Sequence, residues 1–297
     1  MSGGSTLPRR ALGRRLRDLR LKAGKSLLAA AVQIDVSKQT IGRMEEGQYV
    51  RISTAQYQYL LDLYEADQDA RDDVVGLIGE AKAAKGDSAK GWWRAYDDVV
   101  NRHFDHFMSL EQACNKMTTF QLTLLPGLLQ TSAYRRWIVE VTDPAMAPVD
   151  VERRLELIAR RQQRVSRDPG FSLEAILSES ALRYQVGGSQ TMSEQAKYLL
   201  EVGNMPNVSI RVIPFGAQAH PGLVVQSFTL FDFPSLITSR PPEPSVAFVE
   251  GFTGALFLED DGVIERYRAT VAALRQVALS EDDTRRLVQE IAEEYGS

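Results

Sequence analysis

The chain has 297 residues, 44% of them hydrophobic and 25% charged, which is typical of a soluble globular protein and long enough for about two domains. Its single cysteine excludes an intrachain disulfide framework and suits a reducing compartment. No apolar run approaches the ~20 residues that span a bilayer, and the arginine-rich N-terminus lacks the apolar core of a secretory signal, so we expect a cytoplasmic protein without a membrane partner.

The charge is distributed unevenly along the chain. Residues 1 to 62 carry 11 Lys and Arg against 5 Asp and Glu, whereas the rest carries 24 against 34. A basic segment on an acidic chain indicates a part that meets a polyanion, and the acidic remainder resists non-specific binding to it. A solvated, arginine-rich helix face would give the same count, so charge alone does not decide.

The first 84 residues predict a small all-α bundle. One apolar stripe at helical spacing consists of Leu12, Leu16, Leu19 and Ala23. Gly24 ends this helix, and Ser26 then caps a second helix with the sequence LLAAAVQI. Ser53 begins a fourth helical segment, and residues 69–84 form a further helix.

A third helix lies between these, in the stretch VSKQTIGRMEEG. Ser37 caps it and Gly47 closes it. Together with the second helix and a turn of three or four residues, it forms a helix-turn-helix, whose second helix can lie in the DNA major groove. The apolar residues that would hold the two helices together are Ala30, Ala31, Ile34, Val36, Ile41 and Met44.

The polar residues at the front of helix 37–46 are the predicted DNA contacts. Lys and Arg suit guanine, Gln suits adenine, and the Thr methyl group suits thymine. The candidates for base readout are Lys38, Gln39, Thr40 and Arg43. The candidates for phosphate contacts are Arg14, Arg15, Arg17, Lys25, Ser37, Gln48 and Arg51. The alternative is a capped amphipathic surface helix with no ligand.

Residues 12 to 64 resemble the DNA-binding domain of the xenobiotic-response-element (XRE) family, which includes the phage Cro and repressor domains. This resemblance implies a five-helix fold and sequence-specific operator binding. The sequence departs from the family at Asp35, where glycine is usual, although aspartate tolerates a left-handed conformation. It also departs on the outer face of the second helix, which is usually polar but here carries Leu28, Ala29 and Val32.

A linker over 85–91, KGDSAKG, separates this domain from a second domain over 92–297. The second domain opens with helices through Lys116, and a long charged helix covers about 151–165. The run FSLEAILSE alternates like a strand, a helix covers about 192–202, and four β-rich runs follow. Two helices close the chain, the last with a capping box of Ser280 and Asp283. The predicted fold class is therefore multidomain, with an all-α helix-turn-helix bundle followed by an α+β domain.

The second half is similar to the C-terminal domain of a group of actinobacterial XRE-type regulators. The motifs that carry this resemblance are LLPGLLQT, LSESALRYQVGG, VIPFGAQAHPGL, FVEGFTGALFLED and ALSEDDTRRLVQEIAEE. Members resembling the sporulation regulator WhiJ are commonly encoded beside a small acidic protein, in an arrangement somewhat like an antitoxin and its toxin. The resemblance implies such a partner and carries no established chemistry.

Motifs of enzymes and cofactor sites are missing from the sequence. It contains no GxSxG, GxxxxGK[ST], GxGxxG or HExxH, so we expect neither an enzyme nor a bound cofactor. His103 and His106 are too few for a zinc site, and Cys114 is expected to be a packed thiol. Glu179 and Glu250 end predicted strands, where glutamates are usually solvated.

Aromatic residues crowd the start of the second domain, at Trp92, Trp93, Tyr96, Phe104 and Phe107. They form either a hydrophobic core or interface, or a pocket for an unknown small molecule.

The sequence as a whole predicts a transcriptional regulator that binds double-stranded DNA as a homodimer. Two-fold symmetry would place two recognition helices ~34 Å apart on a pseudo-palindromic operator. The second domain would mediate dimerisation and receive a signal or a partner. The alternative is an antitoxin-like interaction protein that neutralises a small acidic partner and binds DNA only for autoregulation.

Overall fold

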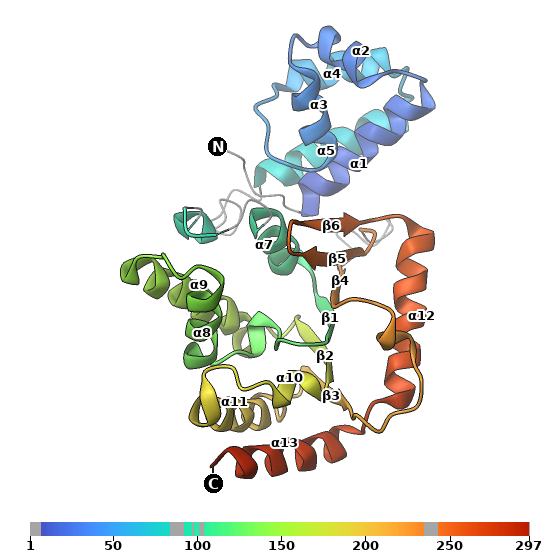
Figure 1. Cartoon of the computed structure of the whole chain (residues 1–297). Coiled ribbons are helices and arrows are strands. Elements are labelled where there is room, and N and C mark those ends of the chain that lie inside the picture. The colour runs from blue at the N-terminus through green and yellow to red at the C-terminus, as the bar shows by residue number, and fades with distance from the viewer. Residues whose placement is uncertain (1–6, 84–91, 97, 101–103, 235–242, 297) are drawn as a thin grey trace. The chain divides into compact units, whose positions relative to one another are not determined.

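The structure, a computed structural model, describes residues 7–83, 92–96, 98–100, 104–234 and 243–296 (Figure 1). The predicted linker over 85–91 lies outside the described residues. Two compact units make up the chain. The first consists of Met1–Ala95, Phe104–Ala113 and Pro234–Glu243, and the second of Tyr96–His103, Cys114–Phe233 and Pro244–Ser297.

Five helices at the start of the first unit confirm the predicted all-α bundle. They are α1 (Leu7–Lys22), α2 (Leu27–Gln33), α3 (Lys38–Glu45), α4 (Thr54–Leu63) and α5 (Gln68–Ala83). The predicted stripe residues Leu12, Leu16 and Leu19 are buried in their common core. Because α2, α3 and α4 have only 7, 8 and 10 residues, this shared apolar core stabilises them more than their own helix propensity does.

Serine side chains begin three of these helices, as predicted. The hydroxyl oxygens of Ser26, Ser37 and Ser53 accept hydrogen bonds from backbone N–H groups in the first turns of α2, α3 and α4. At Ser53 the cap is reciprocal, because the side chain of Gln56 accepts from the Ser53 backbone. Each cap contributes roughly 1 kcal/mol and fixes where its helix starts.

The turn between α2 and α3 requires a left-handed residue. Asp35 adopts a φ of 53°, which confirms that aspartate takes the conformation for which glycine is suited. We expect Asp35→Gly to raise the free energy of unfolding by about 0.5–1 kcal/mol and Asp35→Ala to lower it by about 1 kcal/mol. Thermal denaturation of the full chain measures both changes, and a loss of stability with glycine would contradict the prediction.

Two further helical segments belong to the aromatic-rich stretch after the linker. They are η1 (Trp92–Tyr96), a short 3-10 helix, and α7 (Phe104–Ala113). Trp93 is buried, and its indole N–H donates to Asp105 at 2.7 Å. Phe104 and Phe107 stack with their ring centroids 6.3 Å apart.

The second unit is α+β, as predicted, and is built on a mixed sheet. Its strands are β1 (Lys116–Gln121), β2 (Ser172–Ser178), β3 (Val208–Ile213), β4 (Phe228–Asp232), β5 (Val246–Gly251) and β6 (Gly254–Leu258). Within the described residues the strand order is β3-β2-β1-β4-β5-β6, with β1, β2 and β3 parallel and the other pairs antiparallel.

Strand β1 corrects the sequence prediction. The sequence predicted helices through Lys116 and no strand before the run FSLEAILSE. β1 occupies the centre of the sheet, where Met117, Thr118, Thr119 and Phe120 are all buried. A strand covered on both faces loses the alternation of apolar and polar residues that identifies a strand in a sequence. The hydroxyl groups of Thr119 and Thr229 hydrogen-bond to each other at 3.1 Å, so a polar residue is accommodated in the interior.

Helices cover both faces of this sheet (Figure 1). They are α8 (Ser132–Thr142), α9 (Pro148–Arg167), α10 (Ser180–Arg183), α11 (Gly188–Val202), α12 (Asp261–Val277) and α13 (Glu281–Gly296), with short 3-10 turns η2 (Gly127–Leu129) and η3 (Pro221–Leu223). α12 packs on one face, where its Val271 and Leu274 join a core with Phe120 and Ile176. α8, α9 and α11 lie on the other side of the sheet (Figure 1). The predicted cap of the last helix is confirmed, since the Ser280 hydroxyl donates to the Asp283 side chain and accepts from its backbone N–H.

Candidate nucleic-acid interface

Helices α2 and α3 form the predicted helix-turn-helix. Ala30 and Ala31 of α2 and Ile41 and Met44 of α3 are 0–3% exposed, so these residues join the two helices as expected. α4 supports the turn between them, because the side-chain amide of Gln56 donates to the carbonyl oxygen of Ile34 at 2.9 Å. The sequence pattern identifies Ser53 as a cap. It does not predict that Gln56, which completes the capping box, also contacts Ile34.

The C-terminal end of α3 is fixed against α1 at very short range. A Cβ atom on Gly13 of α1 would lie 2.4 Å from the carbonyl oxygen of Met44 and 2.7 Å from that of Glu45. Only glycine permits this approach of two backbones. The crossing point therefore sets the position of α3 in the bundle, and nothing in the sequence around Gly13 marks it.

A buried ion pair reinforces the same crossing. The Nε and Nη2 atoms of Arg20 donate to the two carboxylate oxygens of Glu45 at 2.6 and 2.8 Å, and the side chains are 9% and 5% exposed. The hydrogen bond to Glu45 raises the pKa of Arg20, although burial opposes the rise, so the guanidinium stays charged. Arg20 also donates to the carbonyl oxygen of Lys25 at 2.9 Å, which ties the α1–α2 turn to α3.

Three of the predicted base-reading residues lie in the first turn of α3. The side chains of Lys38 and Gln39 are exposed and make no hydrogen bond or ion pair with any described residue. Thr40 is half-buried, and its hydroxyl lies 2.9 Å from that of Ser37, whose oxygen accepts from the Thr40 backbone N–H at 3.1 Å. The first turn of α3 therefore presents two unengaged polar side chains beside a polar cap.

Arg43, the fourth predicted base reader, points toward the other end of α3. Its Nε donates to Gln48 at 3.1 Å and its Nη2 to the carbonyl oxygen of Tyr49 at 3.4 Å. Gln48 in turn donates to Glu46 at 3.0 Å. Arg43 and Gln48 thus engage each other in the loop that follows α3, and a contact of either with DNA would compete with these hydrogen bonds.

The predicted phosphate ligands separate into two groups. Arg14 is ion-paired with Glu243 at 2.9 Å and Arg15 with Asp73 at 3.2 Å, both inside the first unit. The side chains of Arg17, Lys25 and Arg51 form no hydrogen bond or ion pair among the described residues. The hydroxyl of Ser37 is occupied as the α3 cap. The cations available without breaking an ion pair are therefore those of the second group.

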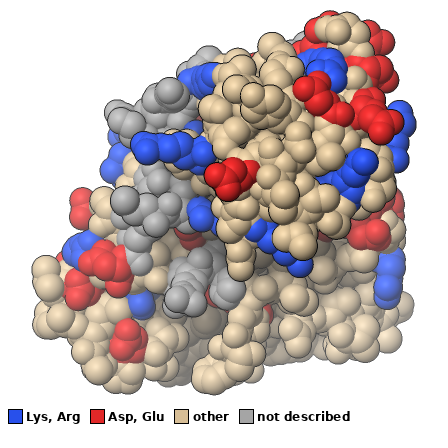
Figure 2. All heavy atoms as spheres, turned by 90° about the horizontal axis from the view of Figure 1, so that it is seen from above, with Lys and Arg blue, Asp and Glu red and all other residues tan. Residues whose placement is uncertain are grey.

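The surface of the molecule is not uniformly basic. On the face seen in Figure 2, Lys and Arg side chains form separate patches with Asp and Glu between them. The outer face of α2 exposes apolar side chains, since Leu28 is 61% exposed and Val32 is 74% exposed. Electrostatic attraction to DNA would thus be concentrated in a few cations.

Several residues outside the helix-turn-helix also carried predictions from the sequence. No group of three potential metal ligands occurs there, and every helix there is too short or too polar to cross a membrane. Cys114 is buried, as expected. Glu179, expected to be solvated, is instead buried, where it accepts from Arg183 at 2.6 Å and from the Phe215 backbone at 2.8 Å. His103 lies outside the described residues.

Comparisons with known proteins match two separate parts of the chain. A family model described as a helix-turn-helix domain matches residues 11–74, which run from within α1 to within α5. A second model, described as a domain of unknown function (DUF5753), matches residues 104–290. No match was found among the curated proteins or among the solved structures. Since the second match covers more than half of the chain, the protein belongs to the DUF5753 family and carries a helix-turn-helix domain in front of it.

Proposed function

We propose that this protein is a sequence-specific DNA-binding transcriptional regulator whose helix α3 enters the major groove. The observation that carries the proposal is the unengaged first turn of α3, where Lys38 and Gln39 project from a helix that is itself anchored by Ile41 and Met44. A side chain can read a base edge at small entropic cost only if its backbone is held rigidly. The helix-turn-helix match supports DNA as the partner.

Each polar residue then has a distinct part in DNA binding. Lys38 would donate to guanine, Gln39 would pair with adenine, and the Thr40 methyl group would contact thymine. Arg17, Lys25 and Arg51 would hold phosphates and set the register. Arg14, Arg15, Arg43 and Gln48 would contribute only after giving up the contacts described above.

The second unit would supply what a regulator needs besides a DNA-binding domain. We propose that it mediates homodimerisation, which would place two α3 helices ~34 Å apart on a pseudo-palindromic operator. It would also receive the signal, from a ligand or a protein partner, in the cytoplasm. The resemblance to WhiJ-like actinobacterial regulators supports a protein partner as the source of that signal.

Fluorescence anisotropy tests the role of α3 directly. The full chain is titrated onto DNA from its own upstream region and onto scrambled DNA, across a salt series. We expect a preference for the upstream DNA that a Lys38→Ala/Gln39→Ala/Thr40→Ala variant loses, at about 1–3 kcal/mol for each base contact removed. Circular dichroism verifies that the variant is folded.

A Lys197→Ala variant provides the matched control, because it also removes one exposed positive charge but lies in α11 of the second unit. It should keep the preference for the upstream DNA. If the wild type and the triple variant bind both DNAs alike, weakly and with steep salt dependence, only phosphate attraction remains and the α3 assignment is wrong.

An antitoxin-like interaction protein is the second candidate, and the exposed Leu28 and Val32 of α2 favour it, since apolar side chains on a small helical domain suit a protein partner. Co-purification of a small acidic protein at fixed stoichiometry, abolished by Leu28→Ser/Val32→Ser substitution, would support it. Purification of the chain without any such protein, or equal co-purification with the substituted variant, would argue against it.

A further inference from the structure

A groove of about 660 Å³ opens in the second unit where the three parallel strands begin. Its floor is formed by the first residues of β1, β2 and β3, and its walls by the α11–β3 loop and the facing ends of α12 and α13. We call it the strand-start groove. The volume lies within the ~300–1,000 Å³ of typical small-molecule sites, and every residue that lines it belongs to the second unit.

The sheet face that floors the groove changes from apolar to polar. On this face Phe120, Ile176 and Arg211 lie next to one another on β1, β2 and β3. Phe120 and Ile176 are buried under α12. Toward the strand starts the same face carries Lys116 and Glu174. Parallel strands covered by helices are normally apolar on both faces. The polar end of this face therefore indicates a surface in contact with water or a ligand. Arg275 of α12 lines the groove at this end.

Two of the four cations that line the groove are neutralised by carboxylates. Arg275 donates from Nε and Nη2 to the two oxygens of Glu174, each at 2.6 Å. Burial alone would raise the pKa of Glu174, but these hydrogen bonds and the charge of Lys116 outweigh it, so the pKa lies below its ordinary value and the pair stays charged. Arg285 is ion-paired with Asp282.

The charged groups that remain in the lining are two cations and one carboxylate, so hydrogen-bond donors exceed acceptors among them. Lys116 and Arg211 make no side-chain hydrogen bond or salt bridge with any described residue. The one other carboxylate in the lining, Glu281, accepts from the Ser209 hydroxyl at 2.5 Å. The groove is therefore a locally basic site in a part of the chain, residues 63–297, that carries 24 Lys and Arg against 34 Asp and Glu.

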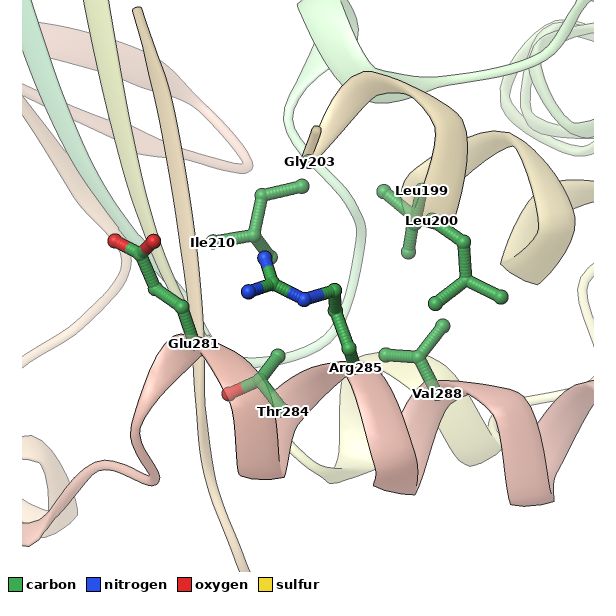
Figure 3. Close-up of a pocket in the computed structure, with 8 residues that line it drawn as sticks. All are labelled: Leu199, Leu200, Gly203, Ile210, Glu281, Thr284, Arg285 and Val288. Carbon is green, nitrogen blue, oxygen red and sulfur yellow. The ribbon is translucent and has the colours of Figure 1, made fainter. Parts of the chain in front are cut away.

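Beside the groove lies a small apolar cavity that shares Gly203, Glu281 and Arg285 with it. In Figure 3, Arg285 rises from α13 between Glu281 and Val288 toward Ile210, with Leu199 of α11 beside it. The cavity left there is about 10 Å³, about the size of one water molecule, so no ligand fits in it. A ligand in the groove would lie over the polar floor, within reach of Lys116 and Arg211.

We propose that the strand-start groove binds a small anionic molecule whose phosphate or carboxylate groups are held by Lys116 of β1 and Arg211 of β3. A lysine supplies a point charge with three donors and an arginine a planar fork of donors, and both suit anionic oxygens. Arg211 is half-buried without a hydrogen-bond partner among the described residues, so an anion would supply the contact that its side chain lacks. The proposal concerns ligand binding alone and does not depend on DNA recognition by α3.

Isothermal titration calorimetry of the full chain tests whether the groove binds anions. The probes are inorganic phosphate, citrate and a non-operator DNA duplex. Sodium chloride at matched ionic strength is the blank. Lys116→Gln/Arg211→Gln removes the two cations, neither of which holds a contact that the fold needs. Lys197→Gln/Arg167→Gln removes the same charges from exposed positions of α11 and α9, away from the groove. Thermal unfolding without added anion verifies that both variants are folded.

We expect saturable binding of phosphate or citrate by the wild type and the control, and at least about tenfold weaker binding by the groove variant for each of the two cations removed. A preference for phosphate over citrate would assign the anionic group as phosphate, and the reverse as carboxylate. Equal binding by all three proteins, no saturable heat with either anion, or groove-dependent binding of the duplex alone would overturn the proposal. The triple alanine variant of α3 should keep anion binding, so failure of one proposal is distinguishable from failure of the other.

Discussion

Glu45→Ala is expected to lower the free energy of unfolding of the α1–α5 bundle by about 3–5 kcal/mol, because it leaves the buried guanidinium of Arg20 without its bidentate partner. The loss is large for a single substitution because burial amplifies an uncompensated charge. Removing both partners should cost less than removing Glu45 alone, since the Arg20→Ala/Glu45→Ala variant buries no charge. Hydrogen exchange of the amides in α1 and α3, followed by mass spectrometry, measures the effect within this part of the chain.

The half-buried pair Arg15–Asp73 provides the control for this prediction. Its side chains are 37% and 34% exposed at a separation of 3.2 Å, so Asp73→Ala should cost at most about 1 kcal/mol. Equal losses for Asp73→Ala and Glu45→Ala would show that burial of the Arg20–Glu45 pair has no special weight. We also expect Glu45→Ala to weaken operator binding at DNA concentrations where the wild type is saturated, because α3 would lose its anchor.

Gly13→Ala is expected to destabilise the same bundle by about 3 kcal/mol, because the added methyl group would meet backbone atoms of α3 that cannot move aside independently. α1 and α3 must separate or shift along each other to relieve the clash. The first turn of α3 would then be displaced together with Lys38 and Gln39, so operator preference should fall along with stability.

Gly79→Ala in α5 is the matched substitution, since a Cβ atom there has no neighbour within 4 Å. Replacing a helical glycine by alanine at an open position should stabilise by up to about 1 kcal/mol. Urea denaturation followed by far-UV circular dichroism compares the two variants. If Gly13→Ala behaved like Gly79→Ala, the close approach of α1 and α3 would not exist in solution.

Local signals in the sequence predicted most of the helix-turn-helix. The caps at Ser26, Ser37 and Ser53 depend on residues at most three positions away, and the apolar stripe of α1 depends on helical spacing. Long-range contacts were not predictable in this way. Nothing near Arg14 in the sequence indicates that it pairs with Glu243, which lies 229 residues further along the chain. The set of cations available to DNA therefore had to come from the structure.

The second unit shows the same limit for strands. The runs that form β2, β3 and β4 alternate or are flanked by Pro or Gly, so the sequence predicts them. β1 follows α7 without a glycine or proline between them, and it is buried on both faces. Neither a turn residue nor an alternation of apolar and polar residues therefore identifies it as a strand. The β-branched pair Thr118 and Thr119 was the one available signal. The strand-start groove could not be predicted from the sequence either, because its lining comes from six separate segments of the chain.

The central position of β1 has a consequence for how the protein is made. Its antiparallel neighbour β4 lies far along the chain, since Thr119 and Thr229 are 110 residues apart. At a synthesis rate of about 5–20 residues per second, the ribosome needs roughly 5 to 20 s to produce β4 after β1. The local contacts of α1–α5 form far sooner than that. The nascent chain should therefore carry a finished helical bundle while one edge of β1 remains unpaired, until β4 has been synthesised.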